Sequence, residues 1–154
     1  MSVERQTISI LSAAVFVMLC LNATWAAPLS PSAKSSFVTV NGVKLHYIDW
    51  GGQGETILFL AGFNDTAHVY DSFAPQFTDR FHVLGVTRRG VGDSDKPATG
   101  YDTSTWVEDI RQFLDSLGIG KVNLIGHSMA GGEITLFATR YPERVARLVS
   151  GRGL

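Results

Sequence analysis

The stretch that decides the fold is Val122-Asn123-Leu124-Ile125-Gly126-His127-Ser128-Met129-Ala130. It begins as an apolar run and leads through small residues into residues 131–141, which favour a helix. A serine between small residues at such a junction is typical of a nucleophile elbow, a tight turn that lifts the hydroxyl clear of the sheet. Small residues are needed because the strand and helix backbones nearly touch there. The pattern therefore predicts an exposed Ser128 at the end of a buried strand.

The composition is that of one ordinary globular domain. The chain has 154 residues, of which 45% are hydrophobic and 18% charged, and its formal net charge is −1. The 13 Lys and Arg residues are scattered along the sequence. Nucleic-acid binding would require clustered basic charge, so no nucleic-acid partner is expected.

The first 26 residues have the pattern of a secretory signal peptide. An apolar run covers Ile8 to Leu21, and Thr24 and Ala26 place small residues at the −3 and −1 positions of a cleavage site after Ala26. The less favoured alternative is an uncleaved membrane anchor, because the run is shorter than the roughly 20 residues that span a bilayer. We therefore expect export to the periplasm or the extracellular space. Cleavage would also remove Cys20, the single cysteine, so no disulfide is expected.

Residues 27–36, rich in Pro and Ser, predict a linker to a domain over residues 37–154. Strands are predicted at 37–40 and 43–48, joined by a primed Asn41-Gly42 turn. Further strands are predicted at 56–60, 81–86 and 122–125, and the start of another at 145–149. A capping box of Thr105 with Glu108 should begin a helix that Gly118 closes. A hairpin followed by strand–helix units predicts an α/β fold, with a mostly parallel sheet flanked by helices.

Four segments in order resemble the α/β-hydrolase fold family, and the match runs from about Phe37 to about Val149. They are the elbow at 126–130, Leu60-Ala61-Gly62-Phe63-Asn64 after the third strand, residues 89–97 after the fourth strand, and residues 141–145 after the elbow helix. Each is weak alone, and their common register makes the resemblance specific. It implies that the chain is the N-terminal part of such a fold.

The resemblance implies a serine hydrolase that cleaves an ester, thioester, amide or related acyl bond of a small molecule. Ser128 matches the nucleophile, which in this family is activated by a His that an Asp or Glu orients. Backbone N–H groups of Phe63 and Met129 match the oxyanion hole. Serine, in place of aspartate, argues against epoxide hydrolase or haloalkane dehalogenase chemistry, which uses a carboxylate nucleophile in this fold.

Three positions depart from the usual pattern of the family. Ala61-Gly62 stands where His-Gly is frequent, and Asn64 stands where Pro is frequent. Ala130 replaces the final glycine of the elbow, which we interpret as a tolerated variant. The oxyanion donors are backbone groups and are therefore insensitive to these side-chain changes.

No base for Ser128 is expected among the histidines, which are His46, His68, His82 and His127. The glycines at 90 and 92 lack the third glycine of a dinucleotide loop, and no cluster has metal-ligand spacing, so neither a cofactor nor a metal is expected. By the resemblance, residues 89–97 form a surface loop near the cleft.

The catalytic acid and His of the family follow later strands, and this sequence stops at Leu154. We therefore expect a fragment in which the triad cannot close, so that the chain alone is inactive. An unpaired apolar strand edge would then favour aggregation or a covering partner, and the oligomeric state is left open. The alternative hypothesis is a non-catalytic remnant or binding module that keeps the floor of the pocket.

Overall fold

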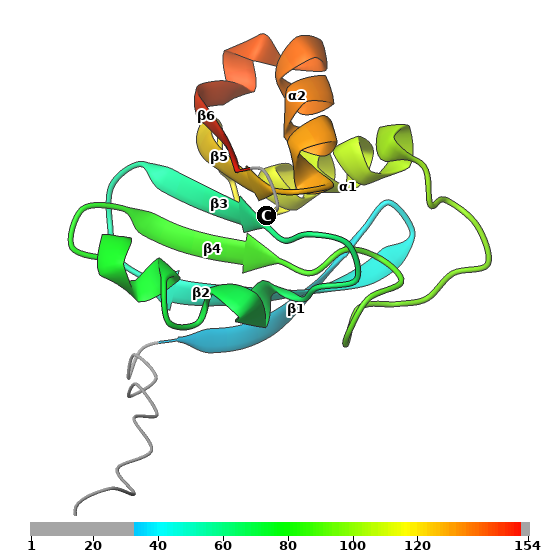
Figure 1. Cartoon of the computed structure of the whole chain (residues 1–154), viewed down its shortest axis with the longest axis horizontal. Coiled ribbons are helices and arrows are strands. Elements are labelled where there is room, and N and C mark those ends of the chain that lie inside the picture. The colour runs from blue at the N-terminus through cyan, green and yellow to red at the C-terminus, as the bar shows by residue number, and fades with distance from the viewer. Residues whose placement is uncertain (1–32, 152–154) are drawn as a thin grey trace, which may run out of the picture.

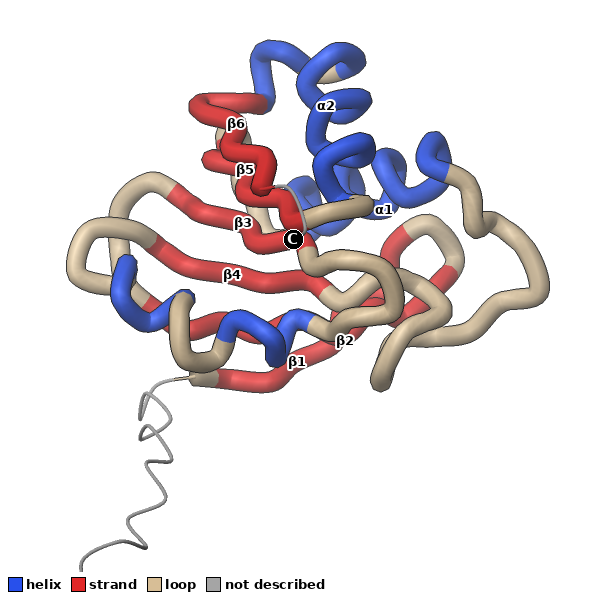
Figure 2. Tube along the Cα trace, in the orientation of Figure 1, coloured by secondary structure: helices blue, strands red, loops and turns tan. Residues whose placement is uncertain are grey.

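The computed structural model describes residues 33–151, which form one sheet of six strands (Figures 1 and 2). The order across the sheet is β1-β2-β4-β3-β5-β6. β1, β2 and β4 pair antiparallel, whereas β4, β3, β5 and β6 pair in parallel. This confirms the predicted α/β class. The strands are β1 (Lys34–Val40), β2 (Val43–Gly51), β3 (Thr56–Leu60), β4 (His82–Val86), β5 (Val122–His127) and β6 (Val145–Gly151).

The β1–β2 hairpin turns at Asn41 and Gly42, whose φ angles are +47° and +74°. Two positive φ angles are what a primed two-residue turn requires, so the predicted turn is confirmed. β1 begins at Lys34 and not at Phe37, so residues 34–36 of the predicted linker belong to the sheet. The predicted signal peptide and Cys20 lie outside the described residues.

Central strand β3 is buried on both faces, as its continuous apolar run predicted. Leu58 and Leu60 contribute to a core beneath α1 (Thr103–Ser116) and α2 (Ala130–Arg140), the two helices seen together above the sheet in Figure 1. Ile57 and Phe59 point to the opposite face, where they pack beneath two short 3-10 helices, η2 (Ala67–Tyr70) and η3 (Ala74–Phe77). A third, η4 (Pro142–Arg144), leads from α2 into β6.

The start of α1 differs from the prediction. Asp102 is the N-cap, and its carboxylate accepts hydrogen bonds from Thr105 N at 3.0 Å and Thr105 Oγ1 at 2.7 Å. The predicted capping box of Thr105 with Glu108 is therefore wrong, because Glu108 instead accepts from Arg111. At the other end, Gly118 has a φ of +67° just beyond the helix, so the predicted stop is confirmed.

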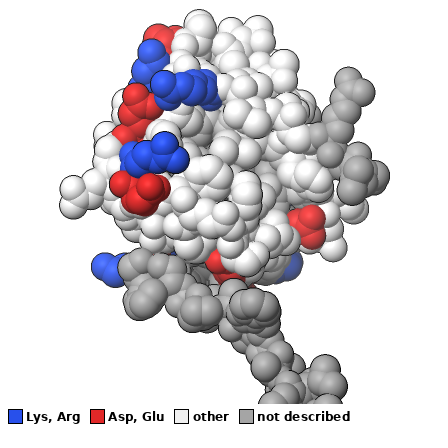
Figure 3. Space-filling model, turned by 60° about the vertical axis from the view of Figure 1, so that its left-hand side comes forward, with Lys and Arg blue, Asp and Glu red and all other residues white. Residues whose placement is uncertain are grey.

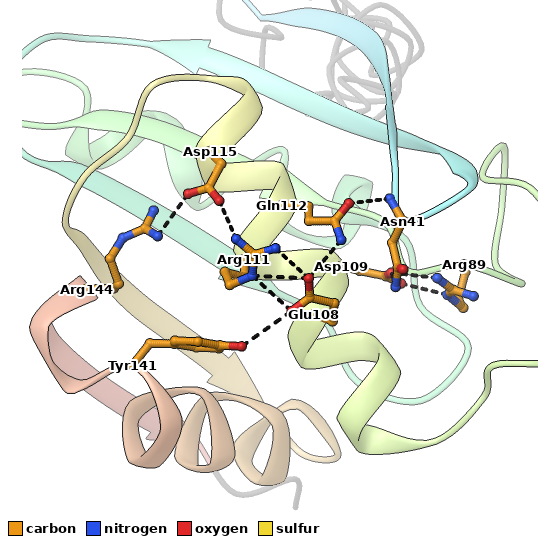
Figure 4. A network of polar contacts seen from close by, with 9 residues as sticks. All are labelled: Asn41, Arg89, Glu108, Asp109, Arg111, Gln112, Asp115, Tyr141 and Arg144. Atoms are coloured by element: carbon orange, nitrogen blue, oxygen red, sulfur yellow. Dashed lines mark hydrogen bonds and ion pairs between the residues drawn. The ribbon is translucent and has the colours of Figure 1, made fainter.

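A polar network along α1 ties this helix to the hairpin, to the loop after β4 and to the segments around α2 (Figure 4). Asp109 Oδ1 accepts from Asn41 Nδ2 at 2.7 Å and from Arg89 Nη2 at 2.5 Å. Both members of the Arg89–Asp109 ion pair are 6% exposed. The outer part of the network comprises Glu108, Arg111, Gln112, Asp115, Tyr141 and Arg144.

Charged groups of both signs adjoin one another along the left-hand margin of the face shown in Figure 3, and others lie toward its lower edge. Much of the remaining surface in that view is uncharged. Exposed ion pairs within residues 33–151 include Arg147 with Glu55, whose side chains are 66% and 59% exposed. Water screens such pairs, so they contribute little to stability.

Candidate active site

The turn between β5 and α2 holds Ser128 in the left-handed region, at a φ of +55°. Left-handed backbone costs a non-glycine residue roughly 1–2 kcal/mol, so neighbouring contacts must hold it. Ser128 N donates to Gly151 O at 2.9 Å, and Ser128 O accepts from Gly131 N at 2.9 Å. The residue is exposed and directly follows the last residue of β5. The predicted strand–turn–helix geometry is therefore present.

Close packing at this turn explains its small residues. A Cβ on Gly126 would lie 2.8 Å from Ile134 Cδ1 and 3.0 Å from the carbonyl oxygen of Ala130. A Cβ on Gly131 would lie 2.7 Å from Ser150 Oγ on β6. Gly132, by contrast, has open space around its position. Glycine is therefore required by the close packing at positions 126 and 131. Ala130 is fully buried, so its methyl group is accommodated at this turn.

The loop after β3 lies directly against the elbow. β3 pairs with β5 in a register that sets Leu60 opposite Gly126, so both strands deliver their following loops at the same edge. A Cβ on Gly62 would lie 3.5 Å from Ser128 Cβ and 3.2 Å from His127 Nδ1. Asn64, the next turn residue, has a φ of +59°. The missing side chain at Gly62 thus lets this backbone approach the serine.

Phe63 and Met129 line one cavity of about 160 Å³ beside the elbow. Within residues 33–151, neither backbone N–H has a hydrogen-bond partner, so both donors are available. Phe63 is 77% exposed, whereas Ala61 and Gly62 before it are buried. The other lining residues are Asn64, Arg88, Arg89, Gly90, Val91, Tyr101 and Trp106. The loop after β4 therefore borders the cavity, as the resemblance implied.

Arg88 is a buried residue beside this cavity that sequence reasoning missed. Its Nε donates to Glu133 Oε1 at 2.5 Å, and both side chains are nearly inaccessible, at 6% and 1% exposed. Its other nitrogens donate to the carbonyl oxygens of Ala61 and Gly62. One signal could have revealed the pair, because Glu133 lies on the apolar face of α2 with Ala130 and Phe137.

Three of the four histidine rings in the described part of the chain hydrogen-bond other side chains, and none of the four hydrogen-bonds the Ser128 hydroxyl. His46 is 1% exposed, its ring hydrogen-bonds Ser35 and Thr87, and its pKa is lowered by burial. The other two partnered rings bond carboxylates, His68 with Asp71 and His82 with Asp49. His127 is exposed. Among the described residues, no side chain hydrogen-bonds the Ser128 hydroxyl.

Within residues 33–151, no group of three or more His, Cys, Asp or Glu side chains is placed to hold a metal ion. In the same part of the chain, no helix combines the length and the apolar character needed to cross a bilayer.

Residues 55–151 match the family model described as alpha/beta hydrolase fold. The soluble epoxide hydrolase of Corynebacterium sp. (strain C12) is 34% identical over 109 residues, which cover 71% of this chain and 38% of that protein. The 2-(acetamidomethylene)succinate hydrolase of Mesorhizobium japonicum is 33% identical over 99 residues, covering 64% of this chain and 36% of that protein. The crystal structure of wild-type Cfl2 from Burkholderia cenocepacia superposes with a TM-score of 0.77 at 35% identity. That match covers 82% of this chain and 44% of Cfl2.

The chain spans about two-fifths of the length of the curated relatives that it matches. The family model alone covers more than half of the chain, and it includes β3, the loop after it, the elbow and β6. Sheet order and the strand–turn–helix at Ser128 agree with this match. The chain therefore belongs to the α/β-hydrolase fold family, among relatives that are hydrolases.

Proposed function

We propose that this chain carries the nucleophile and the oxyanion hole of a serine hydrolase that acts on small acyl substrates. The observation that carries the proposal is Ser128 itself, held at a φ of +55° and exposed next to the backbone of Gly62. Strained backbone conformations cluster at functional sites, and a serine in such a turn presents its hydroxyl for nucleophilic attack.

The proposed reaction has two steps. In the first, Ser128 Oγ bonds the acyl carbon, its proton passes to a base, and the leaving group departs with that proton. In the second, water cleaves the acyl-enzyme and restores the serine. Serine attack on an epoxide would instead leave an ether, which has no acyl carbon for water to attack. The residue type therefore favours acyl substrates, although several relatives are named epoxide hydrolases.

The N–H groups of Phe63 and Met129 are the proposed oxyanion donors. They border the same cavity, have no partner within residues 33–151, and follow the neighbouring strands β3 and β5 at the same edge of the sheet. A single donor of this kind contributes roughly 100- to 1,000-fold in rate.

We further propose that the acid and the base lie outside residues 33–151, and that this chain alone turns over little. The support is that no described side chain hydrogen-bonds the Ser128 hydroxyl. A serine hydroxyl without its base is a weak nucleophile. The same observation favours the second candidate function, a module that binds an acyl compound without turnover.

A fluorophosphonate probe with added imidazole as a replacement base tests the proposal. We expect an adduct on Ser128, identified by peptide mass spectrometry, whose rate rises with imidazole concentration. Ser128→Ala should abolish the adduct, and Ser150→Ala, at the neighbouring exposed serine on β6, should leave it unchanged. Folded protein that gives no Ser128 adduct at any imidazole concentration would contradict the nucleophile and favour the binding module.

We also propose that residues 1–26 direct export, supported by the apolar run and the small residues before Ala27. N-terminal sequencing of protein recovered outside the cytoplasm should begin at Ala27. A chain that stays in the cytoplasm with Met1 in place would contradict this proposal.

A further inference from the structure

Arg88 joins two segments that meet at the proposed site. It follows β4, and its Nη1 donates to Gly62 O at 2.8 Å while its Nη2 donates to Ala61 O at 2.5 Å. Its Nε donates to Glu133 on α2, the helix that begins directly after the nucleophile. One side chain therefore connects the loop after β3 with the nucleophile helix.

The contact with Gly62 acts on the proposed oxyanion donor through a single rigid group. Gly62 C=O and Phe63 N–H belong to the same peptide unit, which is planar and trans. In a trans unit the two bonds point in opposite directions, so holding the carbonyl oxygen fixes the direction of the N–H. A charged donor on the oxygen also polarises the unit and makes the N–H a stronger hydrogen-bond donor.

Glu133 holds Arg88 in place through a buried ion pair. Burial raises the pKa of Glu133, and the charge of Arg88 opposes that rise. Within residues 33–151, Glu133 Oε2 and Trp106 Nε1 are buried without a hydrogen-bond partner. Both residues border a cavity of about 10 Å³, roughly the space of one water. Apolar residues often replace a buried ion pair without loss of stability, so the burial of this pair is weak evidence for a stabilising role.

A neighbouring ion pair provides the contrast. Arg89 and Asp109 are buried to a similar degree, at 6% exposed each, and are joined by two hydrogen bonds. Asp109 also binds Asn41 at the hairpin turn, and the hydrogen bonds of this pair do not reach the loop after β3. Arg88 therefore holds the loop after β3 against α2, whereas the adjacent Arg89 holds α1 near the hairpin turn.

We propose that Arg88 and Glu133 are positioning residues that fix the direction of the Phe63 N–H relative to the nucleophile helix. This inference rests on the proposed function, since only an oxyanion hole gives the direction of that N–H a catalytic meaning.

The test is backbone ¹⁵N relaxation of residues 62–64 in the 154-residue chain, with Arg88→Met/Glu133→Leu as the variant. Apolar side chains of similar length should preserve the fold while leaving the Ala61 and Gly62 carbonyls without their donor. We expect the order parameter of Phe63 to fall from about 0.85 to below about 0.6. The matched control, Arg89→Met/Asp109→Leu, should leave residues 62–64 unchanged.

Labelling kinetics with the fluorophosphonate and imidazole provide the chemical readout. The variant should lose roughly 100-fold in the maximal labelling rate with an unchanged half-saturating probe concentration, because the donor acts on charge that develops in the transition state. Arg88→Lys keeps the charge but replaces three separate donor nitrogens by one ammonium, which cannot reproduce the fixed geometry toward Glu133 and both carbonyls, so its rate should be intermediate.

The two measurements separate the two proposals. A folded double variant with unchanged order parameters at 62–64 would overturn the positioning role, whatever the labelling shows. Absence of Ser128 labelling in the wild type would overturn the proposed function, while the relaxation result still tests whether Arg88 and Glu133 hold residues 62–64 in place. Should the double variant fail to fold, Arg88→Lys decides, since unchanged motion at 62–64 in that variant would overturn the inference.

Discussion

Gly126→Ala should destabilise the protein, because the added methyl group enters a tight contact between β5 and α2. Its Cβ would lie 2.8 Å from Ile134 Cδ1 and 3.0 Å from the carbonyl oxygen of Ala130. Ile134 is fully buried, and the Ala130 oxygen belongs to the backbone, so neither can yield freely. Overpacking of this kind costs about 1–3 kcal/mol. The lower entropy of the unfolded alanine chain recovers about 0.4–1 kcal/mol, so we expect a net loss of about 1–2 kcal/mol.

Urea unfolding followed by tryptophan fluorescence measures this loss. Gly132→Ala is the matched control on the same helix, since nothing lies within 4 Å of its added Cβ. That variant should gain up to about 1 kcal/mol, as alanine usually does over glycine within a helix. Adding Ile134→Val to Gly126→Ala removes Cδ1, so the double variant should lose less than the sum of the single losses. Wild-type stability in Gly126→Ala would refute the close approach of β5 and α2.

Two further predictions concern α1. Glu108 has a pKa lowered to about 2, mainly by its hydrogen bonds from Arg111, so it stabilises the fold above its ordinary pKa near 4.5. This stabilisation should fade as the pH falls from about 4.5 to about 2, and acid titration of Glu108→Gln should show a shallower loss of stability over that window. Asp102→Ala should cost about 1 kcal/mol, because Thr105 N loses its cap, whereas Asp102→Asn should keep most of it. An equal loss in both cap variants, measured by thermal unfolding, would contradict a capping role.

Local patterns were sufficient for much of the fold. Asn41-Gly42 predicted the hairpin turn, and the run at 56–60 predicted both the bounds and the burial of β3. The elbow was predicted from its small residues, and the observed φ of Ser128 agrees with it. In these cases the physical cause lies within a few adjacent residues, so a single sequence contains it.

Contacts between distant segments could not be predicted in the same way. Arg88 and Glu133 meet only because β4 and β5 flank β3 in the sheet, and no local pattern specifies that order. The start of α1 was misplaced for a different reason. Asp102 and Thr105 are both good N-cap residues and lie one helical turn apart. Which of them caps the helix depends on the position of the preceding loop in the folded protein.

The position of β3 has a consequence for how the site is assembled during folding. β3 lies between β4 and β5, both of which follow it in the sequence, and its register sets Leu60 beside Gly126. The loop at Phe63 and the elbow at Ser128 therefore stay apart until β5 docks along β3. Parallel pairing across such a sequence separation closes a long loop and is slow. We expect the site to form in a late folding event, so that refolding kinetics, more than equilibrium stability, limit how soon a newly made chain presents an ordered nucleophile.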